Sequence, residues 1–374
     1  MKEIVHEHQT EIIFSDFDQF YKTKEYLEYR KLWNNNPVNK DPGKFPVNID
    51  VSVTNHCNLR CTMCKRTVTL ADKELWNSGK VMDPKLMFLD FEIFKKVIDE
   101  GVEKGLQAVH LTGHDGEPTM HKELPEMIKY ARSKGLPDVF THSNATYLHT
   151  KNKKDPSGKD LTDRLLDAQP HRIVFSVDSP VKETYEKIRV RGNYDQVVKN
   201  IQEFIKRKKE RNLVFPIVKV QMVVMKQNKE ELNLFKSLFK DELEADVLGF
   251  TEFLNYHNIT KGSIDGKDSG VGHVHKGVMN NHYICDYPYR RIRLDQSGFV
   301  YACLTGQYHK LGHAKFSTIE EMWHGKYMKE LRENHIKFGA CKTSGCEDCG
   351  RQWTAEKLIK PDLDIQEVEY GYRP

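Results

Sequence analysis

The sequence lacks several features that mark particular classes of protein. No segment approaches the ~20 consecutive apolar residues of a membrane-spanning helix. The amino terminus is polar, so we expect no secretory signal. The excess of positive charge is small, with 58 Lys and Arg against 54 Asp and Glu, which gives no reason to expect a nucleic acid or an anionic membrane as partner.

Cysteines are few, but their distribution is informative. The chain has eight in 374 residues, and most of them are clustered. Without a secretory signal, clustered cysteines indicate a reducing compartment, where they bind metals more often than they form disulfides. We therefore expect a cytoplasmic protein. The length suffices for one large domain and a smaller one.

The first cluster is the spacing Cys57-x₃-Cys61-x₂-Cys64, which follows an alternating apolar run at residues 47–53. A closed structural metal site uses four protein ligands, whereas a site that works on a substrate keeps one position open. Three cysteines after a strand therefore favour a working iron–sulfur cluster. Structural zinc with His56 or His110 as fourth ligand is the alternative, although zinc sites more often use paired C-x₂-C units.

Strand-like and helix-like patterns alternate after this loop. Six apolar strand segments occur between residues 47 and 250, separated by amphipathic helical segments. Such repeats predict a parallel sheet covered by helices, with ligands at the carboxyl ends of the strands.

The cysteine triplet resembles the signature of the radical S-adenosylmethionine (SAM) enzymes. In that family three cysteines hold a [4Fe-4S] cluster, and the free iron chelates the amino and carboxylate groups of SAM. The segment 113–119 follows the second strand and looks like the family's Gly-Gly-Glu-Pro motif. The resemblance implies that Gly116 and Glu117 contact the SAM ammonium. Met63 stands where relatives carry an aromatic residue, and it could cover the adenine similarly.

Further SAM contacts are implied at the ends of later strands. Asn144 follows the third strand, where relatives carry Thr-Asn-Gly, and Ser176 follows the register of the family's Ser-x-Asp-Gly. Either Arg189 or Arg191 matches an arginine near the SAM carboxylate, and we take Arg191 as the candidate. A guanidinium suits a planar anion because it binds with two parallel hydrogen bonds.

A second cysteine group follows residue 283. The stretch 292–301 predicts a β-hairpin that brings Cys285 and Cys303 to one end, and a helix over 318–333 leads to Cys346-x₂-Cys349. Four thiolates suit a closed four-iron cluster or a zinc site. The order of hairpin, helix and paired cysteines resembles the auxiliary-cluster modules called SPASM and Twitch, in the shorter version with one auxiliary [4Fe-4S] cluster.

Cys341 is left over by this assignment. It is either a spare buried thiol or a hydrogen-atom donor to a substrate radical, as a thiol is in some epimerising relatives.

The expected fold is α/β, a partial (β/α)₆ barrel followed by a small α+β domain. The expected division is an N-terminal helical extension at 1–46, the barrel at 47–255, the auxiliary-cluster domain at 256–352 and a C-terminal tail at 353–374.

The resemblance implies reductive cleavage of SAM to a 5′-deoxyadenosyl radical that abstracts a substrate hydrogen atom. We expect oxidation or epimerisation of a sugar, an aminocyclitol or another small metabolite, with electrons from a flavodoxin or ferredoxin. The alternatives are a maturase of a ribosomally made peptide, or an iron–sulfur or zinc protein that carries electrons or senses.

Overall fold

The computed structural model describes most of the chain. It describes the backbone of residues 2–6, 9–14, 18–64, 66–67, 87–114, 116–151, 157–225, 227–252, 282–304, 309–347 and 349. The tail expected at 353–374 therefore lies outside the described residues, as does most of the segment between the two predicted domains.

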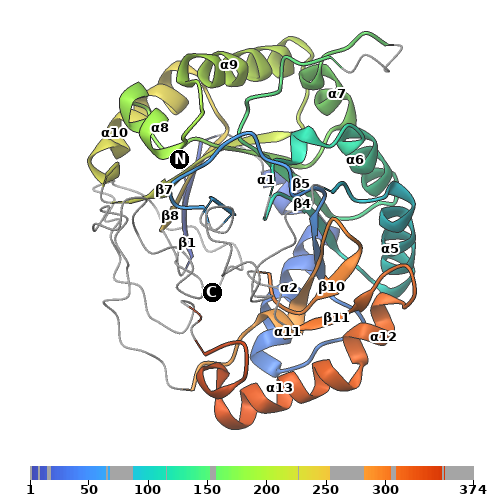
Figure 1. The fold of residues 1–374 in the computed structure, drawn as a ribbon. Coiled ribbons are helices and arrows are strands. Elements are labelled where there is room, and N and C mark those ends of the chain that lie inside the picture. The colour runs from blue at the N-terminus through green and yellow to red at the C-terminus, as the bar shows by residue number, and fades with distance from the viewer. Residues whose placement is uncertain are drawn as a thin grey trace.

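Six parallel strands form the curved centre of the sheet (Figure 1). Each is hydrogen-bonded to its neighbours in chain order, so the predicted partial barrel is confirmed. The strands are β3 (Asn48–Ser52), β4 (Ala108–Thr112), β5 (Asp138–Ser143), β6 (Arg172–Ser176), β7 (Ile217–Val224) and β8 (Val247–Glu252).

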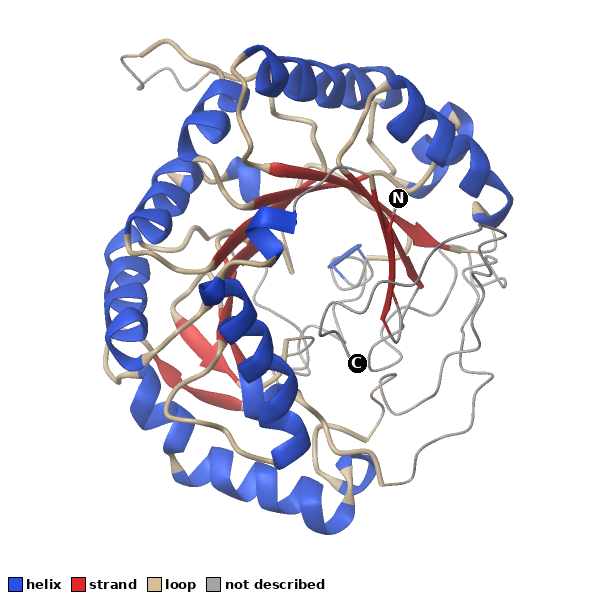
Figure 2. Ribbon diagram, turned by 180° about the vertical axis from the view of Figure 1, so that it is seen from behind, coloured by secondary structure: helices blue, strands red, loops and turns tan. Residues whose placement is uncertain are grey.

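Helices cover the convex side of this sheet (Figure 2). The side chains of Asp90, Asp160 and Asn193 cap three of these helices by accepting hydrogen bonds from backbone N–H groups in the first turn. These caps explain where the three helices begin. Their buried apolar faces pack in one core with alternate strand residues such as Ile49 and Val51. The helices are α5 (Phe91–Lys104), α6 (Leu124–Ser133), α7 (Leu161–Ala168), α8 (Lys182–Ile188), α9 (Tyr194–Glu210) and α10 (Leu232–Lys236).

The expectation that residues 1–46 are helical is only partly right. Helices α1 (Asp18–Tyr21) and α2 (Lys24–Asn39) are present, but β1 (Lys2–His6) and β2 (Gln9–Ile13) form an antiparallel hairpin before them. The hairpin adds to the free edge of β8, with β2 antiparallel to it. That pairing partner lies more than 230 residues away, so local sequence did not reveal the strands.

Helix α2 packs against the amino-terminal ends of the barrel strands. Its residues Tyr26 and Tyr29 share a buried cluster with Phe20, with Val47 directly before β3 and with Ala108, the first residue of β4. The helix thus closes that end of the barrel.

The remaining strands continue the same sheet beyond β3. Strand β9 runs parallel to β3, and β10 and β11 follow antiparallel. The predicted hairpin is confirmed, and the predicted helix is divided in two at Gly325. These elements are α11 (Tyr287–Arg290), β9 (Arg291–Leu294), β10 (Phe299–Tyr301), β11 (Lys310–His313), α12 (Ile319–His324) and α13 (Lys326–Phe338).

Direct contacts join this C-terminal part to the barrel. The carboxylate of Glu100 on α5 accepts the backbone N–H groups of Ile319 and Glu320 at the start of α12. The Trp323 indole donates to the carbonyl of Pro42. Within the described ranges, no helix is long and apolar enough to cross a bilayer.

Candidate functional site

The concave side of the sheet, which encloses the lumen of the barrel, is polar. On β3 the apolar Ile49 and Val51 pack against the helices, whereas Asn48, Asp50 and Ser52 alternate with them and lie on the lumen side. The neighbouring strand repeats the pattern, because His110 pairs in register with Asp50. The interior of a closed eight-stranded (β/α)₈ barrel is usually filled with branched apolar side chains, and the polar lumen of this six-stranded partial barrel differs from it.

Asp50 is the centre of a buried network in the lumen. Its carboxylate accepts hydrogen bonds from Arg291 Nε and Nη2 at 2.8 and 2.7 Å and from Asn48 Nδ2 at 2.7 Å. His110 Nδ1 lies 3.4 Å from the same carboxylate. Burial raises the pKa of Asp50, but Arg291 together with His110 and His114 outweighs it and holds the pKa well below its usual range. Asp50 is therefore an ionised carboxylate at neutral pH.

Two further ion pairs lie in the lumen. Lys219 Nζ on β7 lies 2.6 Å from Glu11 Oε1 on the added strand β2, and Arg172 on β6 pairs with Asp138 on β5. Burial lowers the pKa of His110 to about 4 and that of His142 to about 3, so both imidazoles are neutral near pH 7.

Four buried polar atoms on β3 and β4 have no hydrogen-bond partner among the described residues. They are Asn48 Oδ1, Ser52 Oγ, His110 Nε2 and Thr112 Oγ1. Ser52 pairs in register with Thr112, one layer above the Asp50–His110 pair. Leaving a buried polar group unpaired costs about 1–3 kcal/mol, so these atoms are suited to a bound ligand or ordered water.

The cysteine loop lies directly beyond the carboxyl end of β3. Two backbone hydrogen bonds tie it to the end of α8, from Arg60 N to the Val190 carbonyl and from Thr62 N to the Ile188 carbonyl, each 2.9 Å. The Arg60 guanidinium donates to the carbonyl of Cys57 at 3.0 Å.

The three thiols of this loop influence one another electrostatically. Burial raises the pKa of Cys57 to about 11, with Glu117 and Cys64 contributing. Burial also raises the pKa of Cys61 to about 12, opposed by Arg189 and supported by Cys64 and Cys57. Because buried thiolates are this unfavourable without a counter-charge, the loop suits a cationic metal centre bound by all three sulfurs.

Gly116 permits close approach of the loop after β4 to the cysteine loop. A Cβ atom at this position would lie 2.3 Å from the Thr54 carbonyl oxygen and 2.7 Å from that of His56. Both atoms belong to the backbone, so the two loops cannot keep this arrangement with any larger residue.

Glu117 joins this loop to the end of β5. One carboxylate oxygen accepts hydrogen bonds from the backbone and hydroxyl of Thr119, and the other accepts from Asn144 N at 2.7 Å. The side chain of Asn144 in turn donates to Asn58 Oδ1 in the cysteine loop at 2.9 Å. The structure thus brings Gly116, Glu117 and Asn144 together beside the cysteines.

The two candidate arginines lie in different environments. Arg189 is buried, donates from Nε to Asp178 Oδ2 at 2.7 Å, and lies close enough to Cys61 to lower its pKa. Arg191 is exposed and has a left-handed backbone, with φ of 72°. Because it lies beside Cys61, Arg189 is better placed than Arg191 to contact a ligand at the cysteine loop. The sequence alone did not separate the two arginines. Ser176 is half-buried at the end of β6, opposite Gln221 of β7.

An apolar patch lies beside the cysteine loop. Met63 from the loop packs with Ile188, Val223 and Met225 at the ends of α8 and β7. A flat apolar ring such as adenine would find van der Waals contact here, which suits the expectation for Met63.

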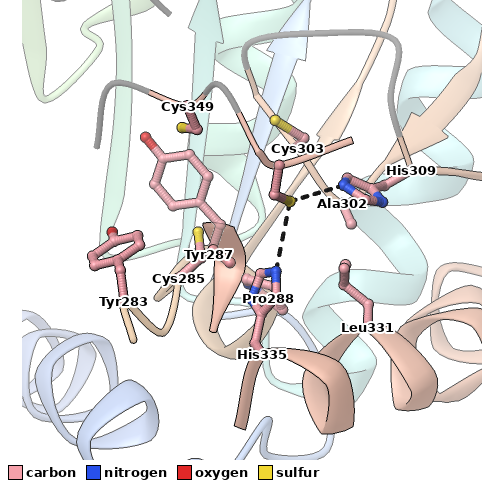
Figure 3. A pocket seen from close by; sticks show the side chains of 12 residues that line it. Tyr283, Cys285, Tyr287, Pro288, Ala302, Cys303, His309, Leu331, His335 and Cys349 are labelled. Carbon is pink, nitrogen blue, oxygen red and sulfur yellow. Dashed lines mark hydrogen bonds between the residues drawn. The ribbon is translucent and has the colours of Figure 1, made fainter. Parts of the chain in front are cut away.

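The second cysteine group surrounds a pocket that is partly open to solvent (Figure 3). Cys285, Cys303, Cys346 and Cys349 all line it. Burial raises the pKa of Cys346, and Cys303 and Cys349 add to the shift, so these thiols lie near one another. The hairpin brings Cys285 and Cys303 to one end, and the Asp295 side chain holds its turn by accepting hydrogen bonds from Ser297 and from Phe299 N.

Cys341 is not among the described residues that line this pocket; it is half-buried on the short helix η5 (Ala340–Lys342). Two histidines, His309 and His335, do line it, and the sequence analysis missed them. They lie 37 and 11 residues from Cys346, so no local motif indicated them.

Two family models match the chain. The model of the Radical SAM superfamily matches residues 51–238, and that of an iron–sulfur cluster-binding domain, SPASM, matches residues 285–350. The two matches contain the cysteine loop and the cysteine-lined pocket, respectively.

Among curated proteins, the chain is similar to a probable GTP 3′,8-cyclase of Pyrococcus abyssi, with 29% identity over 49% of this chain and 49% of that protein. It is 28% identical to the GTP 3′,8-cyclase of Thermodesulfovibrio yellowstonii over 56% of this chain and 58% of that one. The chain thus spans about half the length of these relatives.

Solved structures share the fold at low identity. SuiB of Streptococcus suis, bound to the precursor peptide SuiA, has a TM-score of 0.57 at 14% identity, covering 84% of this chain and 76% of that one. The enzyme anSMEcpe with bound AdoMet has a TM-score of 0.53 at 16% identity, covering 87% and 94%.

Proposed function

Because this chain belongs to the radical SAM superfamily, we propose that it abstracts a hydrogen atom from a polar small molecule held in the barrel lumen. The proposed outcome is oxidation or epimerisation of a sugar, an aminocyclitol or another small metabolite. The cofactors are a [4Fe-4S] cluster with SAM and an auxiliary iron–sulfur cluster. When bound, SAM and the reduced cluster supply a 5′-deoxyadenosyl radical that removes hydrogen from an unactivated C–H bond.

The residues present fit these groups. Cys57, Cys61 and Cys64 would hold the first cluster, since they are closely spaced, half-buried thiols on one loop. The four cysteines around the second pocket, Cys285, Cys303, Cys346 and Cys349, would hold the auxiliary one. Gly116, Glu117, Asn144 and Ser176 remain the proposed SAM contacts, and we now propose Arg189 in place of Arg191 for the carboxylate.

The unpaired lumen atoms are the observation that carries the substrate proposal. Ser52 and Thr112 offer two hydroxyls, and His110 offers Nε2 of a neutral imidazole, and none of these three atoms has a hydrogen-bond partner among the described residues. The charged groups nearby, such as Asp50 with Arg291, are already paired within the protein. Neutral donors and acceptors suit the hydroxyl or amide groups of an uncharged substrate better than they suit a triphosphate.

The lumen also supplies water exclusion and positioning. Helix α2 closes the amino-terminal end, where Trp33 lies 6.5 Å from the His110 ring and beneath Arg291. A substrate would therefore enter at the carboxyl ends of the strands, beside the cysteine loop. Shielding of the radical from solvent follows from this closure.

The remaining assignments are part of the same proposal. The domain boundaries at residues 46, 255 and 352, a flavodoxin or ferredoxin as electron donor, and a cytoplasmic location belong to it. Cys341 is proposed to be a spare thiol, with hydrogen donation to the substrate radical as its rival role.

Release of 5′-deoxyadenosine tests the enzyme class. The protein is reconstituted anaerobically with iron and sulfide and incubated with SAM and dithionite. We expect 5′-deoxyadenosine from the wild type and none from Cys61→Ala. Absence of the product from the wild type would instead support an iron–sulfur or zinc electron carrier or sensor.

Substrate class is tested by stimulation of that reaction. Panels of sugars and aminocyclitols, a candidate precursor peptide and GTP are compared in the wild type and in Ser52→Ala and Thr112→Val. We expect a sugar or aminocyclitol to stimulate the wild type, and each variant to lose the stimulation while retaining slow cleavage of SAM alone. Stimulation by the peptide or by GTP, and not by the sugars, would overturn the proposed class.

Cys341 has its own test. Cys341→Ala should keep the iron content of the wild type if the thiol is spare. Loss of solvent deuterium from the product of this variant would assign it the donor role instead.

A further inference from the structure

Two buried histidines face one sulfur in the auxiliary pocket. His309 follows β10, and His335 lies on α13, with exposed fractions of 7% and 1%. His309 Nε2 lies 3.1 Å from Cys346 Sγ, and His335 Nε2 lies 3.6 Å from the same atom. Figure 3 shows the two rings approaching this sulfur from different elements.

The contacts of the two rings suit the tautomer that carries its proton on Nε2. His309 Nδ1 lies 2.8 Å from the hydroxyl of Tyr327 on α13. A tyrosine hydroxyl that donates to Nδ1 leaves the ring proton on Nε2, which then points at the sulfur. His335 Nδ1 has no hydrogen-bond partner among the described residues, so Nε2 is the atom through which this ring makes its polar contact.

We propose that His309 and His335 are positioning residues that donate N–H···S hydrogen bonds to Cys346 in the auxiliary cluster and thereby raise its reduction potential. A hydrogen bond to a ligating thiolate stabilises the more negative, reduced cluster more than the oxidised one. The auxiliary cluster becomes the better acceptor for an electron that leaves a substrate radical. The proposal rests on the assignment of Cys346 as a cluster ligand.

The reduction potential of the auxiliary cluster can be measured directly in a variant that lacks the SAM-binding cluster. The triple variant Cys57→Ala, Cys61→Ala, Cys64→Ala removes the SAM-binding cluster, so potentiometric titration followed by electron paramagnetic resonance reports on the auxiliary cluster alone. His309→Leu and His335→Leu are introduced into this background. His335→Gln retains a side-chain N–H, and His324→Leu, on α12 with its ring bonded to the Lys44 carbonyl, serves as control.

We expect each leucine variant to lower the ratio of reduced to oxidised cluster about tenfold at a fixed potential, equivalent to about 59 mV for one electron. His335→Gln should recover part of the shift, and His324→Leu should show none. Iron content should match the parent in every variant, and circular dichroism should confirm the fold.

Three results would overturn the proposal. An unchanged potential in both leucine variants with full iron content would show that the rings do not tune the cluster. Loss of iron from either variant while the fold is retained would make the histidine a ligand and not a donor. Absence of iron from the triple variant, with normal 5′-deoxyadenosine release by the full chain, would remove the auxiliary assignment but leave the proposed radical chemistry intact.

Discussion

Removing the charge of Asp50 tests the buried network of the lumen. Asp50 is fully buried and bound by two hydrogen bonds from Arg291, which belongs to the strand that joins the C-terminal domain to the barrel. Asp50→Asn keeps the shape of the side chain but leaves the guanidinium buried without its counter-ion. Breaking such a pair costs about 3–5 kcal/mol, a large part of the roughly 5–15 kcal/mol that stabilises a typical domain.

A matched exposed pair provides the control. Asp195 pairs with Lys182 at the surface, where their side chains are 67% and 47% exposed. Asp195→Asn makes the same chemical change, and we expect almost no effect because water screens that pair. Equilibrium unfolding in urea, compared for the wild type and both variants, gives the two differences in free energy of unfolding.

A second substitution tests whether the destabilisation of Asp50→Asn comes from the unpaired guanidinium of Arg291. Adding Arg291→Met to Asp50→Asn removes the uncompensated charge, so the double variant should be more stable than Asp50→Asn alone. Two results would show that the network does not stabilise the fold as described. The first is that Asp50→Asn lowers the free energy of unfolding no more than Asp195→Asn does. The second is that the double variant loses as much free energy of unfolding as the two single variants together.

Three further predictions concern the same region. Gly116→Ala should force the cysteine loop away from the loop after β4, at a cost of about 1–3 kcal/mol, and iron analysis should show less of the first cluster while the auxiliary one remains. The stability contributed by neutral His110 and His142 should be fully present above about pH 6.5 and should decrease as the pH falls towards 4, because the unfolded chain then binds protons that the folded chain does not. The midpoints of urea unfolding near pH 7 and pH 5 test this prediction. Equal midpoints would contradict it. Arg189→Gln should abolish the change that SAM causes in the electron paramagnetic resonance signal, whereas Arg191→Gln should leave it; the reverse result would restore Arg191 as the carboxylate contact.

The barrel was readable from the sequence because its signals are local. Each strand is a short apolar run, the first three cysteines occupy one loop, and the second group ends in a C-x₂-C pair. The polar face of the lumen was also visible in part, since Asn48, Asp50 and Ser52 alternate with apolar residues in a single strand. That alternation is the signal that could have indicated a polar lumen before the structure was known.

Contacts between distant segments were beyond sequence reasoning. Asp50 and Arg291 are 241 residues apart, and nothing near either residue indicates the other. The choice between Arg189 and Arg191 depends on where α8 ends and on the left-handed backbone of Arg191, which sequence patterns define poorly. The histidines beside Cys346 approach it from another loop and from a helix, so only the folded chain brings them together.

The hairpin at residues 2–13 has a practical consequence for handling the protein. By pairing with β8 it covers hydrogen-bonding groups that a shortened chain beginning after Ile13 would present to other molecules. Unpaired strand edges promote aggregation, so such truncation should reduce the yield of soluble material before it affects turnover.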